Sequence, residues 1–90
     1  MALSKQMTLE ESKSIAHIGY NIAHYRKSRN MTQDTLAERA FISKNTLSAI
    51  ESATRFMNPT ILILMRIADG LDIPVESLIR FDPDIIKDKS

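Results

Sequence analysis

Ninety residues, 43% of them hydrophobic and 26% charged, suffice for one small folded domain that buries about 60–65% of its unfolded surface. The absence of cysteine excludes disulfides and thiol chemistry. No stretch is apolar and long enough for a signal peptide or a membrane span, so we expect a cytoplasmic protein without membrane contact. The net charge is only +1, but the charges are unevenly distributed. Residues 13–66 carry eight basic and three acidic side chains, and residues 67–90 carry three basic and six acidic ones. A basic region that suits DNA therefore precedes an acidic region.

The N-terminal part of the chain predicts one long helix. Residues 1–7 show no periodic pattern and are expected to be flexible, whereas Thr8 and Glu11 have the spacing of a capping box. The helix then extends to about Arg29, and Gly19 inside it costs about 1 kcal/mol relative to alanine, which indicates a close neighbouring helix. Its core stripe is Ile15, Ile18, Ile22 and Tyr25. His17 and His24 have no carboxylate or cysteine at ligand spacing, so we expect no metal site.

Residues 32–51 predict two short helices joined by a tight turn. Thr32 and Ser43 are candidate N-caps for the two helices. Each helix has one apolar edge, and two such edges across so short a turn require the helices to cross. The apolar positions are Leu36, Ala37 and Ala40, then Leu47 and Ile50. Because the opposite side of the second helix is polar, the arrangement is typical of a helix that enters the DNA major groove.

Two further helices follow. Asn58-Pro59 has the composition of a helix start, with proline at its favoured first position. The predicted core residues are Ile61, Leu64, Ile67, Ala68 and Leu71 in this helix, then Val75, Leu78 and Ile79 in a short fifth helix opened by Pro74. Since no alternating strand pattern occurs, we predict an all-α fold, with residues 8–80 as the domain and residues 81–90 as a short tail.

Several of these residues occur in the order that one protein family uses. Thr32-Gln33, Ala37, Ser43 and residues 46–51 are followed by Pro59, Ile67-Ala68 and Leu71. Over roughly residues 15–80 the chain therefore resembles the helix-turn-helix of the phage-repressor (Cro/repressor, xenobiotic-response-element) family. The resemblance implies a compact five-helix, lambda-repressor-like DNA-binding domain, with the helix-turn-helix at helices 2 and 3.

The resemblance also implies roles for individual residues. The positions that face base edges are Lys44, Asn45, Ser48 and Ala49, where asparagine can pair with adenine and lysine with guanine. The expected phosphate contacts are Gln33, Ser43, Thr46, Ser52, Thr54 and Arg55. Arg26 and Glu51 match a buried ion pair that fixes helix 1 against the recognition helix. In the family, Gln33 also braces the first residue of that helix.

Two positions depart from the family pattern. Phe41 occupies the turn where many relatives have glycine, and Ala53 replaces the glycine that often ends the recognition helix. Because residues with a Cβ atom disfavour positive φ, we expect the turn at Phe41 to avoid that conformation.

An apolar surface is predicted before and within helix 4. Leu62 and Ile63 lie outside the predicted core stripe, and relatives usually have polar residues there. With Phe56 and Met57 they would form an exposed apolar patch, which usually marks a contact site. Since the family often forms its two-fold interface in this region, we predict a homodimer through these four residues. The alternative is that the tail covers them.

The leading functional hypothesis is a transcriptional regulator, most simply a repressor, that binds double-stranded DNA at a roughly palindromic operator as a homodimer. One alternative is a DNA-binding antitoxin or regulator whose C-terminal part binds another protein. Another is a helical protein-interaction module that does not bind DNA. We expect no enzymatic activity and no cofactor, because the chain has no cysteine, no phosphate-cradling glycine loop and no recognisable acid–base pair.

Overall fold

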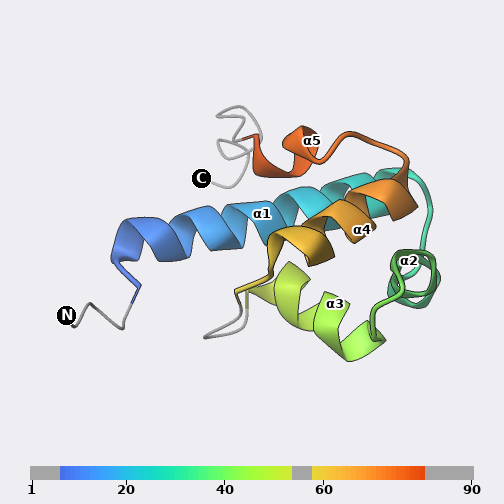
Figure 1. Cartoon of the computed structure of the whole chain (residues 1–90), viewed down its shortest axis with the longest axis horizontal. Helices are drawn as coiled ribbons and strands as arrows, with labels where there is room; N and C mark the ends of the chain where they lie inside the picture. The colour runs from blue at the N-terminus through green and yellow to red at the C-terminus, as the bar shows by residue number, and fades with distance from the viewer. Residues whose placement is uncertain (1–6, 54–57, 81–90) are drawn as a thin grey trace.

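The computed structural model describes residues 7–53 and 58–80, and these residues contain five α-helices and no strand. The helices are α1 (Leu9–Ser28), α2 (Gln33–Ala40), α3 (Lys44–Ser52), α4 (Ile61–Leu71) and α5 (Glu76–Ile79). The long α1 forms the axis of the molecule, with α3 and α4 packed along it, α2 at one end and α5 on the side away from α3 (Figure 1). The predicted all-α fold is confirmed, whereas residues 1–6 and the tail at 81–90 lie outside the described residues. No helix in the described ranges could cross a membrane.

The first three helices begin where the sequence predicts. The Thr8 hydroxyl accepts from the Glu11 N–H at 3.0 Å, and the Glu11 carboxylate accepts from the Thr8 N–H at 2.9 Å. Thr32 and Ser43 cap α2 and α3 in the same way, each accepting an N–H three residues ahead. These local hydrogen bonds satisfy N–H groups that the helices cannot pair internally.

The predicted start of α4 is wrong by two residues. Thr60, rather than Asn58, is its N-cap, because the Thr60 hydroxyl accepts from the Ile63 N–H at 3.2 Å. This hydrogen bond satisfies an otherwise open helical N–H, and it outweighs the preference of proline for the first helical position. Pro59 therefore precedes the cap.

The core lies among the helices, and the most extensive packing is between α2 and α4 and between α1 and α3. Its buried apolar residues are Ile18, Ile22, Leu36, Ala37, Ala40, Leu47, Ile50, Leu64, Ile67, Ala68, Leu71 and Leu78. Three core predictions are wrong: Ile61 is 63% exposed, Ile79 is 40% exposed, and Ile15 is half-buried and lies outside the core cluster. Ile63 packs against the core instead, because it lies on the same side of α4 as Gly70, where α2 approaches closely. In α5, only Leu78 is fully buried.

The end of α2 contradicts the expectation that the turn at Phe41 avoids positive φ, and α3 and α4 end in the same conformation. Phe41, Ala53 and Asp72 have φ values of 58°, 54° and 62°, in the left-handed region. At the end of α2 the Phe41 N–H donates to Glu38 O at 3.2 Å, and the Ile42 N–H donates to Ala37 O at 3.0 Å. These hydrogen bonds satisfy carbonyls at the helix end, which offsets the steric cost of the conformation.

Replacing Phe41 with glycine is expected to raise the free energy of unfolding by about 0.5–1 kcal/mol. Glycine removes the cost of left-handed backbone, and part of this gain is lost to its greater freedom in the unfolded chain. The Phe41 side chain is 82% exposed, so little burial is lost. Urea denaturation measures the change. The control is Glu38→Gly, at an exposed position inside α2, which should lower stability by about 1 kcal/mol; a decrease in Phe41→Gly as well would contradict the interpretation.

Candidate nucleic-acid interface

The two helices of the predicted motif present one polar side to solvent. Only residues 41–43 separate α2 from α3, and Leu47 and Ile50 bury the inner side of α3 in the core. On the outer side Lys44, Asn45 and Ser52 are exposed, whereas Ser48 and Ala49 are half-buried. This side of α3 lies at the edge of the molecule opposite α5 (Figure 1). A helix placed in this way can enter a groove of a duplex without movement of the core.

A bidentate ion pair attaches the end of α3 to α1. The Arg26 guanidinium donates to both Glu51 carboxylate oxygens, from Nε at 2.7 Å and from Nη2 at 3.0 Å. Both side chains are largely removed from solvent, at 11% and 6% exposure. The remaining Arg26 nitrogen, Nη1, donates to Met31 O at 2.7 Å, in the connection between α1 and α2. One arginine therefore links α1, the following loop and the end of α3.

Gln33 joins this network from the first turn of α2. Its Nε2 donates to Glu51 Oε1 at 2.9 Å. The resemblance implied a contact with the first residue of the recognition helix, and the structure instead brings Gln33 to the last turn. The carboxylate of Glu51, held by Arg26, is a charged acceptor and forms a stronger hydrogen bond than a neutral group. The orientation of α3 is thus coupled to α2 as well as to α1.

Gly19 sets the distance between α1 and α3. A Cβ atom at this position would clash with the backbone carbonyl oxygen of Ile50 and lie 3.2 Å from that of Glu51. The predicted close neighbouring helix is therefore α3. Gly19 and Arg26 are seven residues apart on α1, so two contacts on one side of this helix position the backbone and the end of α3.

The polar side chains around the start of α3 have local partners. Lys44 Nζ lies 3.8 Å from Asp34 Oδ2, and both side chains are exposed, so solvent screens this pair and a phosphate or base could replace it at little cost. The hydroxyls of Ser43 and Thr46 bond each other at 2.9 Å. Ser52 donates to the carbonyl of Ala49 at 3.3 Å. Thr54 and Arg55, predicted to contact phosphate, lie outside the described residues.

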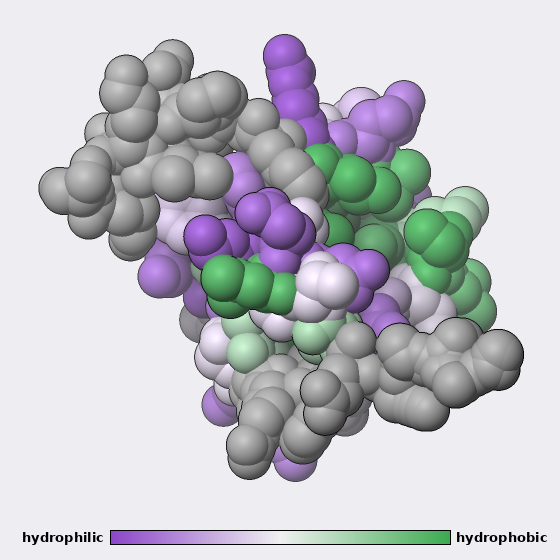
Figure 2. Space-filling model, turned by 90° about the vertical axis from the view of Figure 1, so that its left-hand side faces the viewer, coloured by the Kyte–Doolittle hydropathy of each residue, from purple (hydrophilic) through white to green (hydrophobic). Residues whose placement is uncertain are grey.

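Three apolar side chains of α4 form an exposed surface, which we call the α4 patch. They are Ile61, Leu62 and Met65, exposed by 63%, 55% and 51%. Figure 2, which views this end of the molecule, shows hydrophobic side chains gathered along one side of it. The predicted patch included Leu62 correctly, but Ile63 is half-buried against the core, and Phe56 and Met57 lie outside the described residues. The sequence analysis missed Met65, which lies one turn after Ile61.

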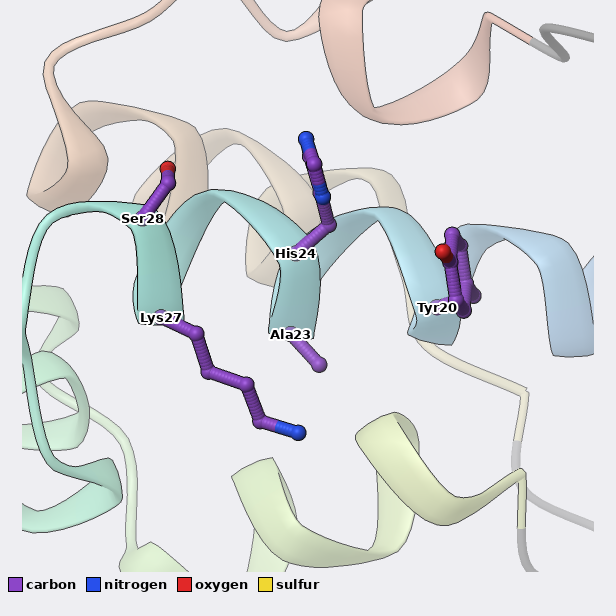
Figure 3. A pocket seen from close by; sticks show the side chains of 5 residues that line it. All are labelled: Tyr20, Ala23, His24, Lys27 and Ser28. Atoms are coloured by element: carbon purple, nitrogen blue, oxygen red, sulfur yellow. The ribbon is translucent and has the colours of Figure 1, made fainter. Parts of the chain in front are cut away.

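A shallow hollow on the outer side of α1 does not form a convergent site. It is lined by Tyr20, Ala23, His24, Lys27 and Ser28. Figure 3 shows that Lys27 extends toward α3, whereas Tyr20 and His24 project to the other side of the helix. The rings of Tyr20 and His24 are stacked, with centroids 6.3 Å apart. Since Lys27 and His24 point away from each other, their polar groups do not converge on one point of the hollow (Figure 3).

Asn21 has a structural role that the sequence analysis missed. Its side chain is almost fully buried, and its Nδ2 donates to Leu78 O at 2.8 Å and to Arg80 O at 2.9 Å. These bonds attach the end of α5 to the middle of α1. The only signal in the sequence is a polar residue between the core residues Ile18 and Ile22, and this signal does not identify the distant partner.

Comparisons with known proteins find the same motif. A family model described as helix-turn-helix matches residues 22–78. The transcriptional regulator SinR of Bacillus subtilis is 37% identical over 62 residues, which are 69% of this chain and 55% of SinR. The chain thus spans about half the length of the curated relatives it matches.

Solved structures of SinR are similar as well. The N-terminal DNA-binding domain of SinR from Bacillus subtilis has a TM-score of 0.67 and 35% identity, over 72% of this chain and 93% of that domain. SinR in a complex with DNA has a TM-score of 0.64 and 36% identity, over 70% of this chain and 98% of the SinR chain. The residues that the family model matches include Arg26, Gln33 and Glu51.

Proposed function

Because this chain belongs to the phage-repressor-type helix-turn-helix family, we propose that it is a transcriptional regulator that recognises a specific double-stranded DNA sequence with α3. One observation carries the proposal: the outer side of α3 is polar and exposed, while Arg26, Gln33 and Glu51 hold the helix rigidly from behind. A reading helix needs both properties, since base-specific hydrogen bonds require fixed donor and acceptor positions. The similarity to SinR bound to DNA supports this function.

In this proposal, one group of side chains contacts the DNA bases and another group contacts the DNA backbone. Lys44 and Asn45 lie in the exposed first turn and supply the hydrogen bonds to base edges, with Ser48 and Ala49 one turn later. The backbone contacts come from residues around the two helix starts and beyond α3: Gln33, Ser43, Thr46, Ser52, Thr54 and Arg55. The first turns of α2 and α3 add open backbone N–H groups, which favour phosphate.

The DNA test is equilibrium binding followed by fluorescence anisotropy. Wild-type protein is titrated against random duplex and against a selected duplex pool at two salt concentrations. We expect sequence-selective binding that weakens steeply with salt, because each neutralised phosphate releases counterions. Binding that is absent at low salt, or that is equal for both duplexes, would overturn the proposal.

The protein in this proposal acts as a homodimer and represses transcription. Two α3 helices related by a two-fold axis would meet successive major grooves about 34–36 Å apart, so the operator would be roughly palindromic. The α4 patch supports the dimer, because three exposed apolar side chains on one helix are typical of a contact surface. Repression requires only that the bound dimer blocks access to DNA.

Replacing Leu62 with glutamate is expected to dissociate the dimer. The side chain is 55% exposed in the single chain, so the change should leave the fold intact while placing a charge in the interface. Sedimentation equilibrium measures the association, and circular dichroism checks the fold. The control is Phe41→Glu, which changes an exposed apolar residue at the end of α2; the turn between α2 and α3 lies away from the start of α4 (Figure 1). Unchanged association of Leu62→Glu would exclude the α4 patch as the interface.

A further inference from the structure

The first two turns of α1 project from the body of the domain. None of the residues from Leu9 to Ala16 is buried, and the first buried residue of the helix is His17. At 1.5 Å per residue these eight residues extend the helix by about 12 Å. Figure 1 shows this end of α1 reaching past α3 and α4. The extension is nevertheless a well-defined helix, because Thr8 and Glu11 form a complete capping box at its start.

The extension is not needed for the helix-turn-helix itself. The family model begins at residue 22, thirteen residues after α1 begins. The contacts that orient α3, at Gly19 and Arg26, also lie beyond the extension. Most helical stability in proteins comes from packing against a neighbour, so a projecting segment without buried residues lacks its main source of stability. A partner surface would supply it.

The α4 patch lies where a partner extension could reach it. The patch occupies the first half of α4, and that end of α4 points to the same side of the molecule as the start of α1 (Figure 1). Its three exposed side chains alone supply far less than the roughly 800 Å² that each partner contributes to a stable interface. A dimer formed by the α4 patch therefore needs a second surface, and the exposed α1 extension lies at the same side of the molecule (Figure 1).

The charges on the two surfaces are complementary. Glu10, in the first turn of α1, is exposed, and Arg66, one turn after Leu62 on α4, is exposed too. Within residues 7–53 and 58–80, neither side chain belongs to an ion pair. Leu9, next to Glu10, is 70% exposed and supplies an apolar group beside the acid. The start of α1, with apolar Leu9 and acidic Glu10, is thus complementary to the apolar α4 patch and the basic Arg66 beside it.

We propose that the α1 extension of each subunit packs against the α4 patch of a second copy of this chain, with Glu10 facing Arg66 of the partner subunit. The two-fold axis repeats the contact, so two extensions and two patches form one closed interface. This inference rests on the proposed homodimer and names the second half of its interface. It also gives the capped but largely exposed start of α1 a packing partner.

The test is charge exchange, measured by sedimentation equilibrium without DNA. Glu10→Lys and Arg66→Glu should each raise the dimer dissociation constant about 5–10-fold, because each places like charges at both copies of the contact. The double variant Glu10→Lys/Arg66→Glu restores opposite charges and should return to within about 3-fold of wild type. If the two single effects simply add in the double variant, the two residues do not face each other and the proposal fails.

A second substitution tests the apolar part of the contact. Leu9→Ser should raise the dissociation constant about 10-fold, whereas Phe41→Ser, at the end of α2, should leave it unchanged. Both residues are exposed, so neither change disturbs the core. In one outcome, Leu62→Glu dissociates the dimer while Leu9→Ser and both charge reversals have no effect. That result would overturn the α1 contact but would still support a dimer formed by the α4 patch. A wild-type protein that binds selected DNA but stays monomeric would overturn both interfaces without contradicting DNA recognition.

Discussion

Replacing Glu51 with alanine is expected to lower the free energy of unfolding by about 3–5 kcal/mol, because the buried Arg26 guanidinium would lose its charged partner. Arg26 is only 9% exposed, so water would replace the lost partner incompletely. Gln33 would lose its acceptor at the same time. For a domain of this size the loss corresponds to a decrease of about 15–30 °C in melting temperature, which circular dichroism measures directly.

Two control variants distinguish the effect of losing the charge from the effect of losing side-chain packing. Glu51→Gln keeps an oxygen acceptor but not the charge, so its melting temperature should lie between those of wild type and Glu51→Ala. The double variant Arg26→Met/Glu51→Leu removes both charges and should recover most of the stability, since no unpaired ion remains. An unchanged melting temperature in Glu51→Ala would refute the structural role assigned to this pair.

Replacing Gly19 with alanine is expected to cost about 2–3 kcal/mol, even though alanine favours the helix by about 1 kcal/mol at an ordinary position. The added Cβ would meet the backbone of Ile50, which cannot move aside as a flexible side chain can. The helices α1 and α3 would have to separate, so DNA affinity should fall together with stability. Urea denaturation and DNA titration of the same variant measure the two effects.

Gly70 provides the matched control for this substitution. It is also buried within a helix, but a Cβ there would lie 3.1 Å from the end of the Leu36 side chain and 3.2 Å from Arg39 Cβ. Rotation of the Leu36 side chain can relieve the first contact, and the second needs a shift of only a few tenths of an ångström between the helices. Gly70→Ala should therefore change stability by less than about 1 kcal/mol in either direction. Equal effects at the two glycines would show that helix separation does not explain the Gly19 result.

The predictable features of the fold are those that depend on neighbouring residues in the chain. The caps at Thr8, Thr32 and Ser43 follow from hydroxyl side chains placed three residues before an open N–H, which is local chemistry. The buried edges of α2 and α3 follow from helical periodicity. The space at Gly19 could be predicted because a glycine inside a helix indicates close packing, although the sequence did not identify α3 as the neighbour.

The features that sequence analysis missed depend on distant parts of the chain. Helical periodicity allows either Ile61 or Ile63 at the edge of the buried stripe of α4. Ile63 is the one that packs against the core, because α2 approaches α4 closely at Gly70. Asn21 reaches backbone carbonyls more than fifty residues away, which no local pattern encodes. At Phe41 the hydrogen bonds that close α2 outweigh a conformational preference. The Arg26–Glu51 pair, 25 residues apart, was expected only through the family resemblance.

The most direct test of the account is binding-site selection from a random duplex pool with wild type and Asn45→Ala. If α3 reads the bases, the variant should lose discrimination at one position of each half-site, by about 1–3 kcal/mol, and keep the preferences elsewhere. Asn58→Ala, the same change in an exposed residue outside α3, should keep every preference. An Asn45→Ala variant that selects the same operator as wild type with equal discrimination would contradict the assignment of Asn45 to base recognition. A wild-type protein that selects no sequence at all would contradict the proposed function itself.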